Sequence, residues 1–386
     1  MNKKLVAVAI AGLLAAPLAQ AQTANVTLYG RVNLDMEFVN GRLNNNTNPQ
    51  IYRVSSNSSR FGLRGTESLG GGLNAIFQME NGSVNMTQGG GNLAGRDSFV
   101  GLSGGWGTFK MGRFLAPYDD IHGIFGNDNT ASTSLLSTAS IWAQGWAGQP
   151  ESGGFDDRLQ KSIRYDSPNM AGFYGEAQFA TNAGTPSSNS NNQSYFVGYR
   201  NGPANFGAAY EYHHNIRGTA ASPLSDSAFS VAGKWQFTGW NLAGVYEKME
   251  YEVQNGIAVN KVKRNFWAVD TTINVGANGQ FFLYYGWAGD GTGSAVNTPP
   301  PVVLPTAIVQ SNVSRVAGLA KGDNTGATDW EVSYSYDLSK RTRIYTGYHK
   351  INNDSNASYN FNINSVNNLS AGGKPGGFVM GMYHNF

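Results

Sequence analysis

The chain has 386 residues, of which 13% are charged, 12% are aromatic and 50 are glycines. An ordinary soluble domain carries about 25% charged residues, so the composition argues against that class. With 27 basic and 25 acidic residues the charge is nearly balanced, which argues against a nucleic-acid binder or a polycationic membrane-surface protein.

The N-terminal segment has the three-part layout of a secretory signal peptide. Two lysines, an apolar run that ends at Leu18 and a small-x-small cleavage site that ends at Ala21 follow one another. The apolar run is shorter than the roughly 20 residues that a membrane-spanning helix needs. We therefore expect a signal peptide over residues 1–21 and a mature chain over 22–386. The sequence has no cysteine, so an exported chain would have no disulfide bonds.

The first mature segment, Val26 to Phe38, alternates strictly between apolar and polar residues. Alternation with a period of two predicts a strand with one apolar and one charged face. Its length is close to what a tilted strand needs to cross a bilayer. Similar alternation occurs in Ser58 to Thr66, Leu73 to Glu80, Phe229 to Phe237, and Trp330 to Asp337. The pattern is irregular in Trp240 to Glu250 and Asn265 to Ile273, and there we assign no face.

The connections between these segments are of two kinds. Short turns rich in Gly, Pro, Asn and Asp are expected at Ser68 to Gly72, Gly104-Gly105, Ser167 to Asn169, Asn201 to Pro203, Thr238-Gly239, Asn278-Gly279 and Asp337 to Lys340. Long polar loops are expected at about Val39 to Asn57, Asn81 to Gly95, Leu115 to Lys161, Ala180 to Asn192, His214 to Asp226, Tyr251 to Arg264, Trp287 to Ala327 and Asn352 to Gly376. Eight long loops and seven short turns imply sixteen strands, and this sorting is typical of outer-membrane barrels.

The fold class that these observations favour is an all-β, sixteen-stranded antiparallel transmembrane barrel. A helical membrane protein would be more hydrophobic, whereas the mean hydropathy here is −0.33. A barrel alternates lipid-facing apolar residues with lumen-facing polar ones, so its mean hydropathy stays near neutral. On the last strand, Phe378, Met380, Met382, His384 and Phe386 share one face.

Six blocks of sequence resemble the general porins of β-proteobacteria. They are TLYGRVN (Thr27 to Asn33), SRFGLRGTESLGGGLNAIFQME (Ser59 to Glu80), GRDSFVGLSGGWGTFKMGR (Gly95 to Arg113), SIRYDSPNMAGF (Ser162 to Phe173), YDLSKRTRIYTGY (Tyr336 to Tyr348) and YHNF (Tyr383 to Phe386). The resemblance implies a homotrimer of sixteen-stranded barrels in the outer membrane. It also implies that the third external loop, about residues 115–161, folds inward to narrow each pore, and that Phe386 is a signal to the outer-membrane assembly machinery.

Charged side chains at the narrowest part of a pore set its selectivity. On the alternation, Arg31, Arg60 and Arg64 should face the lumen, together with Lys234 and Glu37. The resemblance adds Arg96 and supports Arg60, because relatives place barrel-wall arginines at the constriction. The alternative for each arginine is a solvated lumen residue remote from the constriction.

Arg113 resembles the Gly-Arg of relatives at the start of the third loop, but strict alternation would place it on the lipid face. A charge at mid-bilayer costs about 2 to 4 kcal/mol, so we expect a break at Gly112 or a position near the interface. In the loop, Asp119, Asp120 and Asp128 could face the arginines and create a transverse field. The alternative is that these aspartates cap turns.

Other functions have little support in the sequence. Glu211, His213 and His214 could suggest a metal, but no second ligand cluster accompanies them, and we expect a polar aromatic rim there. An outer-membrane barrel hydrolase would need a Ser–His pair that nothing marks. A secreted β-rich glycan-binding protein would explain the aromatic residues but not the sorting of the loops.

We therefore expect a channel rather than an enzyme, without cofactor or bound metal. It should lie in the cell outer membrane, contact its lipids and pass ions and small polar solutes by passive diffusion. The uncharged region at Ile141 to Gln144 argues against a strong anion preference, so a modest one is expected.

Overall fold

The computed structural model describes residues 25–41, 50–82, 84, 86–87, 93–126, 135–142, 155, 157–181, 190–216, 223–255, 258–294, 321–367 and 369–386, without the side chains of 253–255 and 258. The expected signal peptide over 1–21 and the carboxylate of Asp128 lie outside these residues. Within the described ranges, no helix is long and apolar enough to cross a membrane.

Strands make up most of the described chain. They are β1 (Asn25–Asn40), β2 (Gln50–Ser56), β3 (Arg60–Gly70), β4 (Leu73–Glu80), β5 (Ser98–Gly104), β6 (Gly107–Leu115), β7 (Arg158–Asp166), β8 (Phe173–Thr181), β9 (Asn191–Asn201), β10 (Ala204–His214), β11 (Ser225–Gln236), β12 (Asn241–Asn255), β13 (Ala258–Val275), β14 (Gly279–Ala288), β15 (Ala327–Asp337), β16 (Thr342–Asn353) and β17 (Gly376–Asn385). Two 3-10 helices, η1 (Pro117–Gly123) and η2 (Thr138–Ser140), lie between β6 and β7.

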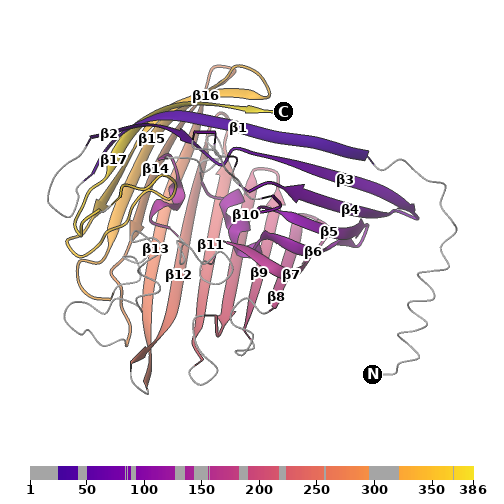
Figure 1. The fold of residues 1–386 in the computed structure, drawn as a ribbon, viewed down its shortest axis with the longest axis horizontal. Helices are drawn as coiled ribbons and strands as arrows, with labels where there is room; N and C mark the ends of the chain where they lie inside the picture. Colours follow the sequence, from indigo (N-terminus) through magenta and orange to yellow (C-terminus); the bar gives the residue numbers. More distant parts are fainter. Residues whose placement is uncertain are drawn as a thin grey trace.

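The strands form one closed antiparallel barrel in which sequence neighbours are also spatial neighbours. β1 closes it, because one edge pairs with β17 while the other pairs with β3 in its first half and with β2 in its second half. β2 and β3 therefore occupy a single barrel position, interrupted near Ser58, whose φ is 52°. The seventeen segments thus form a sixteen-stranded barrel, which confirms the predicted fold class (Figure 1).

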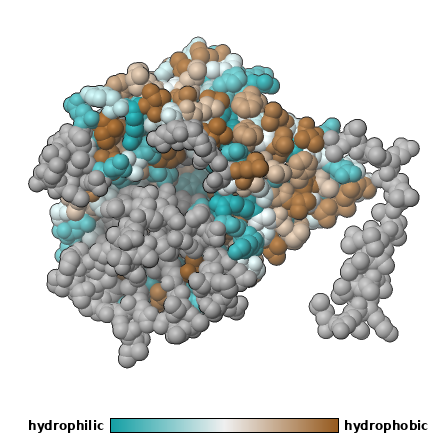
Figure 2. All heavy atoms as spheres, viewed as in Figure 1, coloured by the Kyte–Doolittle hydropathy of each residue, from teal (hydrophilic) through white to brown (hydrophobic). Residues whose placement is uncertain are grey.

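The outward face of the barrel is apolar. On β13, Trp267 and Val269 are exposed, whereas Phe266 and Ala268, the alternate residues, are buried inside. The same alternation exposes large apolar side chains on every side of the barrel, and Figure 2 shows brown, hydrophobic residues gathered over the surface of β3 and β4. A barrel whose outer face is apolar around its whole circumference suits a lipid environment. Closure of the barrel also leaves no unpaired strand edge in the bilayer.

Aromatic side chains contact one another at both ends of this outward face. Near the long loops, Trp267 lies 6.1 Å from Trp287, measured between ring centroids. Near the short turns, Phe237 stacks on Trp240 at 4.2 Å. Outer-membrane barrels carry such aromatic girdles at the two membrane interfaces.

Two of the expected long loops are partly strand. The predicted loop from Val39 to Asn57 contains β2, so the loop is shorter than predicted. The predicted loop from Tyr251 to Arg264 is a β-ribbon, in which β12 continues to Asn255 and β13 begins at Ala258. Opposite charges on neighbouring strands stabilise such a pair. Here Glu250 Oε1 lies 3.1 Å from Lys263 Nζ, its direct cross-strand partner.

Candidate pore constriction

Two of the predicted arginines are direct neighbours on the lumen side of the barrel wall. Arg31 on β1 is the cross-strand partner of Arg60 on β3. Arg31 Nε donates a 2.8 Å hydrogen bond to Asn385 Oδ1, and its guanidinium lies 4.5 Å from the ring centroid of Tyr383. Its Nη1 is buried with no hydrogen-bond partner among the described residues.

Arg60 and Arg96 share one carboxylate. Arg96 Nε donates to Glu80 Oε1, and Arg60 Nε lies 3.8 Å from the same oxygen. The other oxygen, Glu80 Oε2, accepts a 3.0 Å hydrogen bond from Tyr29. The structure thus brings together Arg31, Arg60 and Arg96, which we call the arginine group. Within it, one carboxylate balances part of the positive charge. Glu80 alternates with apolar residues on β4, but no local pattern indicates that it pairs with these arginines.

Arg64 lies on the same lumen face, but away from the arginine group. It is four residues closer to the short turn, or about 13 Å along a strand. Its guanidinium lies 5.0 Å from the ring centroid of Tyr29, and its side chain is exposed to the lumen. The hydroxyl of Tyr29 donates to Glu80, so this ring links Arg64 to the arginine group.

Arg113 is positioned by a break in the strand, as its charge requires. The pairing of β6 with β7 shifts by one residue between Gly112 and Phe114, and Gly112 has a φ of 150°. Lys161, on the other side of the break, has a φ of 50°. Arg113 Nε donates a 3.1 Å hydrogen bond to the carbonyl of Gly95, in the connection that precedes β5. Arg113 therefore lies near the loop end of the barrel, against the residue that precedes Arg96.

The described part of the third loop lies against the inner wall of the barrel. The η1 helix contacts β8, β9, β10 and β11. Pro117 occupies the first turn, where the fixed φ of proline suits a helix start. The backbone amide of Tyr118 donates to Ser194 Oγ at 2.9 Å, and its hydroxyl donates to Glu247 Oε2 at 2.8 Å. Wall residues of β9 and β12 thus hold the helix by both backbone and side chain.

Asp119 and Asp120 occupy the first turn of η1, but Asp120 does not pair with the arginine group. Its Oδ2 lies 2.7 Å from Arg164 Nη2 on β7. Arg164 also binds Asp166 Oδ1 at 2.5 Å and Glu176 Oε2 at 2.7 Å. We call Asp120, Asp166 and Glu176 the acidic group. The backbone amide of Asp119 donates to the carbonyl of Ala116 at 2.9 Å, a turn contact.

Three strands, β4 to β6, separate the wall that carries Arg60 from β7. The arginine group and the acidic group therefore lie on different sectors of the lumen wall. The first has more guanidinium groups than carboxylates, and the second has three carboxylates around Arg164, with Lys110 Nζ 2.9 Å from Asp166. Separated groups of unlike charge create a field across the opening between them. Arg164 was not predicted, although its alternation with Ile163 and Tyr165 marks it as a lumen residue.

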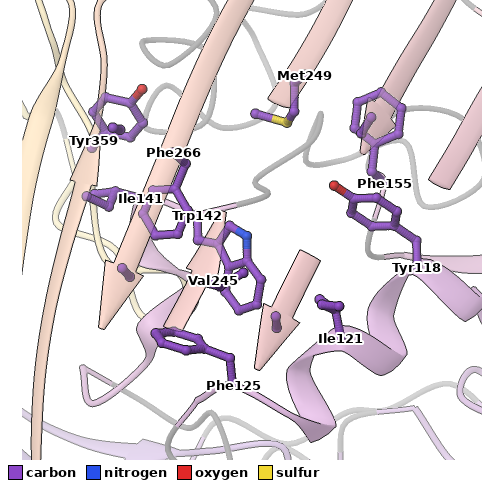
Figure 3. Close-up of a cluster of buried hydrophobic side chains, with 14 of the residues drawn as sticks. Tyr118, Ile121, Phe125, Ile141, Trp142, Phe155, Val245, Met249, Phe266 and Tyr359 are labelled. Carbon is purple, nitrogen blue, oxygen red and sulfur yellow. The ribbon is translucent and has the colours of Figure 1, made fainter. Parts of the chain in front are cut away.

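Apolar packing fixes other described residues of the third loop. Trp142 is fully buried, stacks on Phe266 of β13 at 5.8 Å and meets Phe125 edge-on at 5.5 Å. Figure 3 shows Trp142 between the rings of Phe266 and Phe125 and beside Val245. Met249 lies farther along the same wall. Part of the lumen face under the loop is therefore apolar, a departure from the polar lining expected of a barrel interior.

Histidines also contribute to this packing. Glu211 and His213 are fully buried, with His213 Nε2 2.7 Å from Glu211 Oε1 and the ring 4.6 Å from that of Phe155 in the third loop. The prediction of a polar rim was wrong for these two residues, because the loop covers them. His349 of β16 contacts the carbonyl of Leu135 and, at 3.2 Å, Asp329. Among the described residues no group of three or more His, Cys, Asp and Glu could hold a metal ion.

Comparisons with known proteins agree with this geometry. A family described as Gram-negative porin matches residues 6–356. The major outer membrane protein P.IB of Neisseria meningitidis serogroup B is 34% identical over 228 residues, which cover 56% of this chain and 61% of that protein. The chain thus aligns with about three fifths of the length of this relative.

Solved structures match over almost the whole chain. The anion-selective porin from Comamonas acidovorans has a TM-score of 0.68 at 21% identity, and the match covers 94% of this chain and 100% of that one. The trimer form of OmpT of Vibrio cholerae has a TM-score of 0.65 at 14% identity, with 95% and 100% covered. At these identities the likeness establishes the fold.

Proposed function

Because the chain belongs to the Gram-negative porin family, we propose that it forms a water-filled channel through the outer membrane. Ions and small polar solutes would cross this channel by passive diffusion. The observation that carries the proposal is a closed barrel with an apolar outer face, whose lumen wall holds the arginine group and the acidic group. Charged side chains on the lumen side of the barrel do not contact lipid. They can act on ions and polar solutes that pass through the lumen.

We propose a modest preference for anions. Arg60 and Arg96 converge on Glu80, and Arg31 is the cross-strand partner of Arg60, so three guanidinium groups share one carboxylate in this sector of the lumen wall. The acidic group works in the opposite direction, but Arg164 and Lys110 neutralise much of its charge. The fold resembles that of a porin named as anion-selective, which is consistent with this assignment.

We also propose that the channel is a homotrimer that the outer-membrane assembly machinery inserts. The support is the fold, which the trimeric OmpT structure shares, and the aromatic strand end at Phe386, which matches the pattern of resembling porins. The outer-membrane lipids contact the apolar outer face.

The test combines fractionation with electrical recording. The protein should partition with outer membranes, migrate as a heat-sensitive trimer and, after reconstitution, give stepwise ion currents in planar bilayers. Recovery as a soluble monomer without detergent would support a secreted glycan-binding protein instead. Membrane insertion without any ion current would leave a barrel enzyme as the better account.

A further inference from the structure

The segment between β16 and β17, residues 354–375, is the eighth loop. Its side chains at Ala357, Tyr359 and Phe361 are fully buried, and Val366 nearly so. A loop that extended from the barrel into water would expose these residues. The ring of Phe361 instead lies 5.6 Å from that of His349 on the barrel wall, and the amide of Asn362 donates to Ser140 Oγ of the third loop at 3.4 Å. The eighth loop is therefore folded into the barrel.

Two asparagines give the loop a defined internal structure. Asn353 Nδ2 donates to the carbonyls of Tyr359 and Gly373 at 2.8 and 2.7 Å, while its Oδ1 accepts from the amide of Tyr359 at 2.7 Å. Asn360 binds both backbone groups of Val366 in the same way, at 2.7 and 2.9 Å. Buried amide groups that are satisfied by backbone in this manner fix one loop conformation.

Arg264 of β13 joins the eighth loop to the third. Its Nη1 donates to the hydroxyl of Tyr359 at 2.9 Å and to the carbonyl of Ile141 at 3.1 Å, and its Nη2 lies 3.6 Å from Glu247 Oε1. Burial raises the pKa of Tyr359, so the phenol stays neutral and accepts this hydrogen bond. A buried guanidinium that lost these partners would be strongly destabilising, so both loops are held in place together.

Arg53 of β2 attaches the loop to the other side. It donates to Glu37 of β1 and to the carbonyl of Asn364, and its Nη1 donates to the carbonyl of Ser365 at 3.4 Å. Asn364 Nδ2 in turn donates to Glu37 Oε1 at 2.9 Å and to Asn57 Oδ1 at 3.0 Å. Between β13 and β2 the barrel order runs through β14, β15, β16, β17 and β1. The attached loop therefore spans this whole sector of the mouth.

We propose that the eighth loop is a second, fixed constriction on the long-loop side of the pore, and that Arg53 and Arg264 are the positioning residues that set its width. This inference rests on the proposed channel function. The described parts of the third loop narrow the lumen from β8, which η1 contacts, to β16, where Leu135 meets His349. The eighth loop narrows the sector from β13 to β2, and so the two together restrict the size of solute that enters.

A disulfide tests whether the loop is fixed. A Cβ placed at Gly41 would lie 3.6 Å from Val366 Cβ, close to the mean of about 3.8 Å in disulfides. The chain has no other cysteine, so Gly41→Cys with Val366→Cys offers one possible bond. We expect the bond to form during export and the single-channel conductance to be the same before and after reduction. A conductance that rises on reduction, or a pair that stays reduced, overturns a fixed loop.

Loss of an attachment tests the constriction itself. Arg53→Gln should raise conductance about 1.5-fold and admit larger neutral sugars in a liposome-swelling assay, because the loop loses the hydrogen bonds from Arg53 to the carbonyls of Asn364 and Ser365. Arg341→Gln, at an exposed position in a short turn at the other end, is the matched control and should change neither. Replacing residues 357–369 with a short Gly-Ser linker should increase conductance further.

If both loop variants insert and conduct like the wild type, the second constriction is refuted while the channel stands. If the wild type itself carries no current, the proposed function is refuted instead. Electrophoretic migration as a folded trimer is checked for every variant, so that a change in conductance is never read from misfolded protein.

Discussion

Arg31 and Arg60 face each other directly across the β1–β3 pair, two like charges on the lumen side of the barrel. Like charges in this position destabilise a sheet, and most strand pairs avoid them. Arg60 is compensated by Glu80, and Arg31 rests on Tyr383 and Asn385. The repulsion that remains between the two guanidinium groups costs folding free energy. A role in transport accounts for keeping this pair, whereas a purely structural role does not.

The first prediction concerns this pair. Arg60→Gln should shift the zero-current potential in a KCl gradient toward cation preference. A unit charge about 8 Å from a passing ion in water contributes about 0.5 kcal/mol before screening, so the permeability ratio should change about two-fold and less at high salt. Arg64→Gln, on the same face but four residues closer to the short turn and linked to the arginine group only through Tyr29, is the control and should have a smaller effect. Equal shifts for both variants would contradict a local constriction.

The acidic group gives a prediction of opposite sign. Asp120→Asn removes a carboxylate that lies 2.7 Å from Arg164 and leaves that arginine with Asp166 and Glu176. Selectivity should move toward anions, with a smaller shift than that of Arg60→Gln, because Asp120 is already paired. Reversal potentials of the two single variants and the double variant measure this. A large effect of Asp120→Asn beside none for Arg60→Gln would mean that the loop alone sets selectivity.

Trp142 is predicted to hold the third loop against the wall. Truncation of a buried tryptophan costs about 3 to 5 kcal/mol, and here the cost falls on the contact between loop and wall. Trp142→Ala should therefore leave the barrel and its trimer intact, while the open-channel current becomes noisier as the loop moves. Trp142→Phe keeps a ring against Phe266, and its open-channel current should be almost as low in noise as that of the wild type. Recordings that are equally quiet for alanine and wild type would argue that the ring is dispensable.

Phe386 is predicted to act in assembly. Its backbone exchanges two 3.0 Å hydrogen bonds with Gly30, and a Cβ at Gly30 would lie 2.4 Å from its ring. Phe386→Ser, or deletion of Phe386, should reduce insertion several-fold, whereas deletion of Asn356 in the eighth loop should not. Heat-modifiable migration of membrane fractions gives the yield. Equal yields for these variants would remove the claim that the aromatic is recognised.

Much of the fold could be predicted from period-two alternation, since each lipid-facing side chain obeys the same rule whatever its neighbours. The faces of the strands at Trp240 to Glu250 and Asn265 to Ile273 could not be assigned from alternation, for a physical reason. Their lumen faces mix the apolar Val245, Met249 and Phe266, which pack under the third loop, with the buried acids Glu247 and Asp270. Neither face is uniform in polarity, so the alternation is blurred.

The site was harder to predict than the strands. Arg31 and Arg60 share a face by alternation alone, but the pairing of Asp120 with Arg164 depends on where a folded loop lies. The eighth loop, rich in asparagine and poor in charge, read as a solvent-exposed connection. Its burial follows from hydrogen bonds to Arg53 and Arg264, residues about 90 or more positions away in sequence, and no local pattern reports such contacts.

The seam between β1 and β17 also imposes an order of events on folding. Arg31 and Asn385, which meet there, are 354 residues apart, whereas the other neighbours are mostly joined by local hairpins. Closing so long a segment costs about 2 to 3 kcal/mol more than closing a hairpin of roughly 20 residues. The seam should therefore form last, after β17 has reached the membrane. Until then β1 presents an unpaired edge, and such edges can pair with other chains and lead to aggregation.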